Sequence, residues 1–469
     1  SPFRWRNMFK ILRDILKIPE LRRRIGWTIL LLVVFRFGFH VFIPGIDIPT
    51  FLESQKGKGS GALDWLIYTS ALTGGNLSAP VLFALGIMPY ISASIIFSLM
   101  IKVFPRLEAL SKEGEAGRRQ INKYTRYFTV ILCLIQSYFL IHSWQNQPVG
   151  SNFLAYTGFW PGLVQMLTLS VGSLTLMWLG EKITEIGIGN GTSLIIMVGI
   201  IADMPGQLAR MGRQIQNAEW EQIPFEVSKG VILVLLYLAV VAGVVFITKG
   251  QRRIPIQQQR AVRGRRFYGG ARSYMPIKVN AAGVLPIIFA QSLVVIPSSF
   301  LGWAAYRSDN FFFSFLKVLA NALSRNGFLY IAAYIGLIFF FTYFWTTLMF
   351  NPVEIAGNLK EYGSFIPGIR PGRFTAEYLQ RVIKRITIAD AAFLTAIALT
   401  PQLVTSSLEI DYQIAYMLGG TGILIVVGVA LDLVDKIEAQ LLVRQYEGFM
   451  RGGEGPKRGG PEKKPVPSV

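Results

Sequence analysis

The sequence has almost none of the residues that build metal sites, disulfides or catalytic centres. Its 469 residues include one cysteine, Cys133, and two histidines, His40 and His142. A single thiol inside an apolar run excludes a disulfide framework and a cysteine metal cluster, so Cys133 is expected to pack. The histidines each lie near one end of an apolar run without a partner close in sequence, and we expect structural or interfacial roles for them. No metal or cofactor is expected.

Motifs of membrane enzymes and pumps are also missing. The chain contains no HExxH, GxSxG, GxGD or Walker A pattern, which argues against hydrolysis and nucleotide-driven pumping. Charges are scarce in the middle of the apolar runs, where ion-coupled transporters keep functional ones. Asp203, Asp390, Asp432 and Asp435 all fall toward the ends of runs, where capping or interfacial solvation is expected.

Apolar stretches of membrane-spanning length dominate the chain. Each is about long enough to cross ~30 Å of hydrocarbon as a helix. Helices pair every backbone amide internally, and the runs lack the period-2 alternation of barrel strands. The sequence therefore predicts an all-α membrane protein with ten transmembrane helices, at residues 25–42, 80–101, 125–144, 159–181, 191–209, 229–248, 279–300, 328–350, 386–406 and 413–435.

Positive charge lies mainly in alternate connections between these spans. The side that carries the N-terminus holds 38 of the 47 Lys and Arg residues, whereas the opposite connections hold 7. Because cytoplasmic segments carry the basic excess, both termini are expected in the cytoplasm, which requires an even number of spans. The N-terminal segment 1–24 includes a basic stretch, 8–21, expected along the inner surface. The tail 436–469 is expected to be cytoplasmic and mostly disordered.

Prolines interrupt several spans: Pro89 in the second, Pro205 in the fifth, and Pro286 with Pro297 in the seventh. Proline removes an amide donor and bends a helix, which membrane helices tolerate where neighbours or a cavity satisfy the freed carbonyls. Ordinary kinked packing and a gated pathway both explain these breaks.

A shorter apolar run begins at Ala62, between the first two spans, and ends at Thr73, Gly74 and Gly75. It is too short to cross a membrane, so the sequence predicts a re-entrant helix hinged at its glycines, which could act as a stopper.

Residues 249–278 form the most basic connection, with nine Lys or Arg and no Asp or Glu. A solvated face explains such a run, but the interleaved aromatic and glycine residues favour a loop that binds an anionic partner.

Several motifs occur in the order found in one known family: FALGIMPYISAS (83–94), KEGEAGRR (112–119), YTRY (124–127), MWLGE (177–181), GIGNG (187–191), KVN (278–280), FIPGIRPG (365–372) and GGT (419–421). On these motifs the chain resembles the SecY family, the central subunit of the bacterial Sec protein-conducting channel, from the first span to the tenth. The resemblance implies two pseudosymmetric halves of five helices, 25–209 and 210–435. It also implies a lateral gate made by the second, third, seventh and eighth spans.

The resemblance further implies a central aliphatic constriction, a plug helix and docking loops. Plain packing is the alternative explanation for the constriction isoleucines, although Ile87 and Ile91 are spaced to share one helix face. The plug is expected at 62–73, and the docking loops at 249–278 and 351–385. The implied residues are Ile87, Ile91, Ile196, Ile288 and Ile425 in the constriction; Leu63, Leu66, Ile67, Leu72, Gly74 and Gly75 in the plug; and Arg252, Arg253, Arg263, Arg265, Arg266, Arg370 and Arg373 in the docking loops.

The implied function is passage of unfolded secretory polypeptides across the bacterial plasma (inner) membrane, with lateral release of transmembrane segments into lipid. The implied partners are the SecE and SecG subunits, the SecA motor, the ribosome, signal peptides with nascent chains, and membrane lipids. A secondary transporter built from two five-helix repeats is the alternative; it predicts polar groups at the midplane. A membrane scaffold without a conduit is a third possibility.

Overall fold

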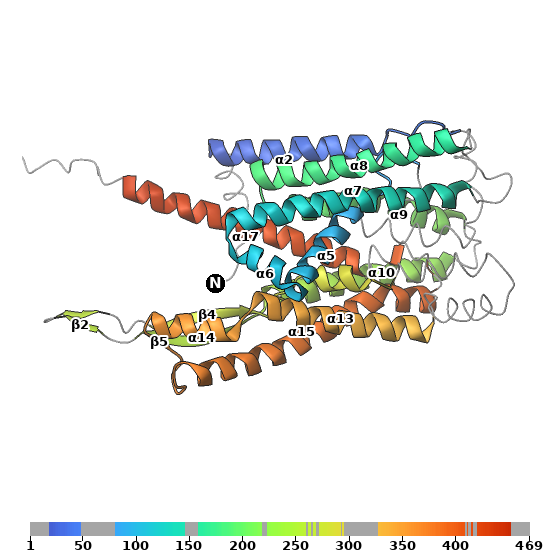
Figure 1. The fold of residues 1–469 in the computed structure, drawn as a ribbon. Coiled ribbons are helices and arrows are strands. Elements are labelled where there is room, and N and C mark those ends of the chain that lie inside the picture. The colour runs from blue at the N-terminus through green and yellow to red at the C-terminus, as the bar shows by residue number, and fades with distance from the viewer. Residues whose placement is uncertain are drawn as a thin grey trace, which may run out of the picture.

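The structure is a computed structural model, and it is predominantly helical (Figure 1). Its helices lie side by side in a bundle, and a small group of strands lies at the end from which α17 extends (Figure 1). This arrangement confirms the helical membrane class predicted from the sequence. The described residues are 18–47, 80–145, 158–217, 223–258, 261–263, 266–268, 272–291, 293–294, 327–408, 410, 414–415 and 420–451.

Five described helices are long and apolar enough to cross a membrane, and the bent pair α5–α6 makes a sixth if it counts as one span. They coincide with predicted spans, because long uncharged runs favour a helix wherever water is absent. The five are α7 (Glu115–Gln145), α8 (Phe159–Ile186), α9 (Gly191–Asn217), α10 (Ile223–Lys249) and α13 (Phe328–Met349).

Three more helices overlap the first, ninth and tenth predicted spans. They are α2 (Pro19–Gly38), α15 (Arg373–Leu408) and α17 (Thr421–Arg451). Of the seventh span, residues 279–291 and 293–294 are described; residues 279–284 form bends and turns, and residues 285–291 and 293–294 are helical. The count of ten spans stays a prediction.

The second span differs from its prediction at its start. Residues 82–87 form turns, and α5 (Met88–Val103) begins at Met88 instead of near residue 80. Pro89 therefore lies in the first helical turn, where a missing amide donor costs nothing, and it begins the helix instead of breaking it. A bend of 100° then separates α5 from α6 (Pro105–Lys112). In α6 the hydrogen bond from Lys112 holds the pKa of Glu108 below its usual value.

The tail predicted from residue 436 begins as helix, because residues 436–451 continue α17. Two features support this extension. Lys436 forms an i,i+4 ion pair with Asp432 at 2.8 Å, and Ile437 and Leu441 pack beside the buried Leu21 of α2. Residues 452–469, like the predicted surface stretch up to residue 17, lie outside the described residues.

The two predicted docking loops contain strands that the sequence did not predict. β1 (Gln251–Gln258) pairs antiparallel with β4 (Arg272–Lys278) on one side and with β5 (Ser364–Phe365) on the other. A second pair joins β2 (Ala261–Arg263) to β3 (Arg266–Tyr268). Because β5 comes from the later loop, the sheet joins both loops into one unit, which we call the docking sheet (β4-β1-β5).

The docking sheet rests on its own small apolar core. Ile254 of β1 lies opposite Met275 of β4, and both belong to a cluster with Ile277, Leu379 and Ile383. Leu379 and Ile383 lie on α15, so the sheet is fixed to a helix of the bundle and is not a free loop.

Helix α8 approaches residues 82–87 very closely at Gly172. A Cβ placed there would collide with the backbone oxygen of Leu82. Gly172→Ala should therefore force the two segments apart and lower the free energy of unfolding by about 1–3 kcal/mol. Gly206→Ala in α9 is the matched control, because nothing lies within 4 Å of the position that its new methyl group would occupy. Thermal unfolding of both variants checks this; an equal effect at the two positions would contradict the close packing.

The structure corrects the expectation for Asp390. Its side chain is not solvated at a span end but fully buried in α15, at 0% exposure. Both carboxylate oxygens lack a hydrogen-bond partner among the described residues.

A buried polar group without partners destabilises a fold. We expect Asp390→Val to raise the free energy of unfolding by about 1–3 kcal/mol. Asp432→Val is the control, since Asp432 is 56% exposed and paired with Lys436. Denaturation in detergent compares the two variants, and a loss of stability in Asp390→Val would show that the carboxyl has a partner.

Candidate functional site

The five isoleucines assigned to the constriction come from four separate segments. Ile87 precedes the first turn of α5, Ile91 lies one turn later, Ile196 lies in α9 and Ile425 lies near the start of α17. Ile288 lies in the helical stretch 285–291.

These isoleucines belong to one central apolar cluster. Ile87, Ile196, Ile288 and Ile425 are 0%, 4%, 7% and 2% exposed, and Ile91 is partly buried against them. Segments from both predicted halves therefore contribute to the same cluster, as a constriction requires; their role in conduction stays a prediction. We call these five residues the isoleucine set.

The backbone near Ile87 is held by α8. Gly86 has a φ of 60°, which favours glycine, and its carbonyl oxygen accepts a hydrogen bond of 3.1 Å from the Ser173 hydroxyl. The Ile87 side chain lies 3.5 Å from the position that a Cβ on Gly180 would occupy. A Cβ at position 180 would therefore make an ordinary van der Waals contact with Ile87.

The segment that carries the predicted plug begins and ends at one place. Phe42 and Val81 form an antiparallel bridge, supported by hydrogen bonds from Ile43 N to Pro80 O at 3.0 Å and from Leu82 N to Val41 O at 2.8 Å. The excursion between these ends thus starts and returns beside the turn that positions Ile87. The plug residues Leu63, Leu66, Ile67, Leu72, Gly74 and Gly75 lie outside the described residues.

Aromatic contacts join the predicted gate helices in pairs. Phe97 of α5 meets Phe128 of α7 at 5.9 Å between ring centroids. Phe289 of the seventh span meets Phe341 and Trp345 of α13 at 5.6 and 5.3 Å. The second span thus packs on the third and the seventh on the eighth. The gate itself stays a prediction.

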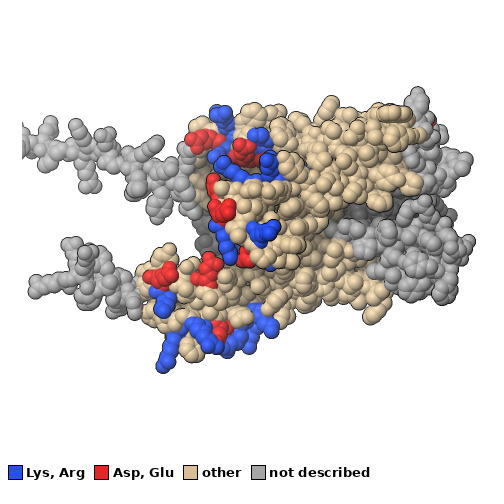
Figure 2. Space-filling view, in the orientation of Figure 1, with Lys and Arg blue, Asp and Glu red and all other residues tan. Residues whose placement is uncertain are grey.

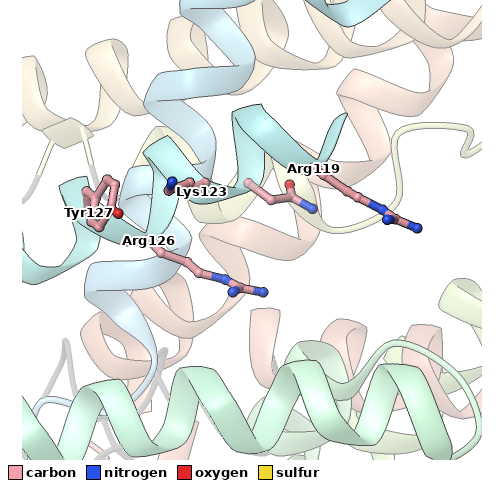
Figure 3. Close-up of a pocket in the computed structure, with 5 residues that line it drawn as sticks. Arg119, Lys123, Arg126 and Tyr127 are labelled. Carbon is pink, nitrogen blue, oxygen red and sulfur yellow. The ribbon is translucent and has the colours of Figure 1, made fainter. Parts of the chain in front are cut away.

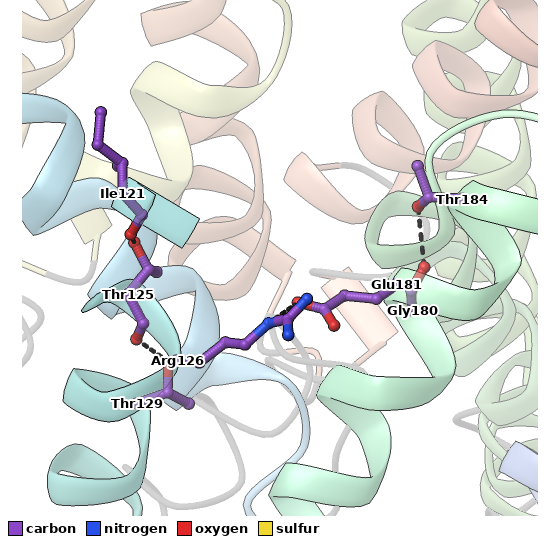
Figure 4. Close-up of polar contacts among 7 residues, drawn as sticks. All are labelled: Ile121, Thr125, Arg126, Thr129, Gly180, Glu181 and Thr184. Carbon is purple, nitrogen blue, oxygen red and sulfur yellow. Dashed lines mark hydrogen bonds and ion pairs between the residues drawn. The ribbon is translucent and has the colours of Figure 1, made fainter. Parts of the chain in front are cut away.

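An ion pair connects α7 with α8 near this region. Arg126 Nε donates to Glu181 Oε1 at 2.9 Å, and Figure 4 shows the Arg126 side chain reaching across between the two helices. The neighbouring hydroxyls of Thr125, Thr129 and Thr184 donate instead to carbonyl oxygens of their own helices. Each of these hydroxyls therefore uses its proton within its own helix, whereas the Arg126–Glu181 pair joins the two helices.

Charged side chains gather at the end of the bundle that carries the strands, whereas the described helices are almost free of charge elsewhere on the face in view (Figure 2). We call this the charged end. Its basic residues match the connections expected in the cytoplasm.

The arginines predicted for the docking loops do not form a single patch. Arg252 and Arg253 are both exposed, but they point to opposite faces of the docking sheet because strand residues alternate. Arg263 and Arg266 are backbone register partners in the β2–β3 pair, and Arg265 lies outside the described residues.

Arg370 and Arg373 flank the start of α15. Arg370 is exposed in a turn between Gly368 and Gly372, whose φ values of 82° and 98° favour glycine. Thr375 Oγ1 donates to the Arg370 carbonyl oxygen at 2.9 Å and fixes this turn. Arg373 already pairs with Glu377 at 3.0 Å, so Arg370 is the more available cation.

Comparison with known proteins decides the family. The SecY family model matches residues 81–434, well over half of the chain. This chain belongs to the SecY family. Proteins named protein translocase subunit SecY are similar along nearly their whole length: that of Thermotoga maritima is 39% identical, covering 95% of this chain and 99% of the relative. Those of Streptomyces griseus and Thermus thermophilus are each 41% identical and cover 95% of this chain, with 100% and 98% of the relatives covered.

Solved structures share the SecY fold at lower identity. A protein-conducting channel is 17% identical with a TM-score of 0.59, and 95% of this chain and 99% of that chain are covered. Sec61 in a canine ribosome-channel complex is also 17% identical, with a TM-score of 0.56 and the same coverage.

The sequence missed two features of this SecY-family chain: the union of its basic loops in one sheet, and the hold of α8 on the Ile87 turn. The alternation of Arg253, Ile254, Pro255 and Ile256 was a signal for the first. Nothing local signalled the second, because Ser173 and Gly86 are far apart in sequence.

Proposed function

We propose that this chain is the pore-forming subunit of a protein translocation channel. It conducts unfolded secretory polypeptides across the membrane and releases transmembrane segments sideways into lipid. The observation that carries this proposal is the convergence of the isoleucine set from both halves in one apolar cluster. Family membership over nearly the whole chain supports it.

An aliphatic constriction suits this task. Ions do not enter a narrow apolar passage because they would lose hydration without any polar replacement. Isoleucine side chains have no fixed hydrogen bonds to break, so the same passage deforms around a chain of any sequence. A sufficiently apolar signal sequence partitions at the gate between α5, α7, the seventh span and α13, and it favours the open state by its higher affinity for that state.

The charged end is the expected docking face in the cytoplasm of a bacterial cell. We expect its docking sheet and Arg370 to meet the ribosome or the SecA motor, which supply the energy for movement. SecE and SecG are the expected partner subunits, and the channel is expected in the plasma (inner) membrane. Salt screens the attraction between a positive docking face and an anionic partner, so their binding should weaken as the salt concentration rises.

Protein import into vesicles tests this function. The chain, reconstituted with its partner subunits and motor, should protect a secretory polypeptide from external protease only when the polypeptide carries its signal sequence. A polypeptide without the signal is the control. Uptake of a small solute without polypeptide import would instead support a secondary transporter.

A further inference from the structure

The interface between α7 and α8 changes from charged to neutral along its length. At the charged end, Arg119 and Arg126 extend to the same side of α7 (Figure 3), and Arg126 pairs with Glu181 of α8 at 2.9 Å. Farther along the same interface the polar groups are small and buried, and Ser137 Oγ of α7 lies 3.2 Å from Ser170 Oγ of α8. Such interior polar groups need hydrogen-bond partners within the protein, because hydrocarbon supplies none.

The Ser173 hydroxyl of α8 reaches beyond its own helix. It donates to the Gly86 carbonyl oxygen at 3.1 Å, and Ser173 is 2% exposed. The thiol of Cys133 in α7 is hydrogen-bonded to the same hydroxyl. Because the one hydroxyl proton goes to Gly86, the thiol is the donor in this second bond. The Ser173 hydroxyl therefore connects α7, α8 and the turn that precedes α5. By contrast, four other hydroxyls of α8 donate to carbonyl oxygens of their own helix: those of Thr168, Ser170, Thr175 and Thr184.

The buried Gly86 carbonyl oxygen depends on this hydroxyl. Among the described residues no backbone amide donates to it, because the first bond of α5 runs from Ile91 N to the Ile87 oxygen at 3.1 Å. A buried carbonyl that loses its donor takes water in its place or destabilises its surroundings. The next residue, Ile87, is the most buried member of the isoleucine set, at 0% exposure. The Ser173 hydroxyl thus controls a polar atom directly beside the constriction.

We propose that Ser173 is a positioning residue for the resting seal: it satisfies the Gly86 oxygen, fixes Ile87 and keeps water out of the constriction. This role rests on the proposed channel function. Ser173, Gly86 and Ile87 belong to the same predicted half, 25–209, so separation of the halves leaves their hydrogen bond intact. Ser173 therefore acts on how tightly the closed channel excludes ions, and not on how readily the channel opens.

Ser173→Ala tests this role in vesicles that hold the full chain with its partner subunits and motor. Water should replace the lost donor at the Gly86 oxygen, and a hydrated constriction no longer excludes ions. Resting ion conductance is divided by the import of a polypeptide with a strong signal sequence, which reports the amount of folded channel. This quotient should rise about five-fold, the factor that corresponds to one net hydrogen bond. Import with a weak signal, relative to the strong one, should keep the wild-type ratio.

Ser170→Ala is the matched control. Ser170 is 3% exposed on the same helix, but its hydroxyl donates to the Met166 oxygen at 2.8 Å and meets Ser137 of α7, not the turn before α5. This variant should conduct as little as the wild type.

The outcomes separate the role of Ser173 from the channel function. Unchanged conductance in Ser173→Ala, or equal leaks in the two serine variants, would overturn the positioning role, while import by wild-type vesicles would still support the channel. A raised ratio of weak-signal to strong-signal import would also overturn it, because the hydroxyl would then act on opening. Wild-type vesicles that import neither polypeptide would overturn the channel function and this role with it.

Discussion

Ile87→Asn should make the resting channel leak ions and should allow export of polypeptides with weakly apolar signal sequences. A polar side chain in the constriction offers hydrogen bonds to water and ions, so the passage no longer excludes them by dewetting. It also removes apolar contacts from the closed cluster, where Ile87 is fully buried. A loss of about 1.4 kcal/mol from the closed state alone increases the population of the open state about ten-fold.

Ion conductance of reconstituted vesicles and export of a weak signal sequence check this prediction together. Ile200→Asn is the matched control: Ile200 is 6% exposed in α9, belongs to the same cluster and lies one turn from Ile196, but it is not in the isoleucine set. A scaffold without a conduit predicts that both substitutions only lower stability. Unchanged conductance in Ile87→Asn would therefore count against a channel.

Reversing charge on the docking face should strongly weaken binding of the ribosome and of the motor. Arg253→Glu and Arg370→Glu each replace an exposed cation by an anion, and neither cation has an ion pair among the described residues. We expect the double variant to bind ribosomes at least about 30-fold more weakly, with the slope of log affinity against log salt reduced by about one for each cation lost.

Arg106→Glu in α6 provides the comparison, because Arg106 is exposed at the charged end but lies outside the docking sheet. Ribosome binding measured over a salt series distinguishes the two outcomes. If Arg106→Glu reduces binding as much as the double variant, attraction depends on overall charge and not on the docking sheet.

Features of this fold were predictable from the sequence where one physical demand dominates. Helices α7 to α10 and α13 were predicted because an apolar run of that length has only one way to satisfy its backbone in lipid. The isoleucine set came from the resemblance alone; apolar composition cannot distinguish Ile87 from a packing residue such as Ile200. The structure adds that its members meet in one cluster.

The features missed by the sequence depend on contacts between distant segments. β1 forms because Ile254 pairs with Met275 of β4 and shares an apolar cluster with Leu379 and Ile383 of α15, and none of these residues is local. The sequence predicted a helix break at Pro89. In the structure Pro89 lies in the first helical turn, because the preceding turn is held by the distant Ser173. The sequence predicted a solvated Asp390 because this residue lies near the end of a predicted span. Its burial depends on the packing of other helices, which the sequence does not show.

The central claim is that a polypeptide in transit passes through the isoleucine set, and site-specific photocrosslinking of a stalled export intermediate tests it most directly. A photoreactive residue at Ile91, Ile288 or Ile425 should crosslink to the chain in transit. One at Leu235, which is 61% exposed on α10, should crosslink to lipid instead. Crosslinks to the polypeptide at Leu235, with none at the isoleucine positions, would contradict the account.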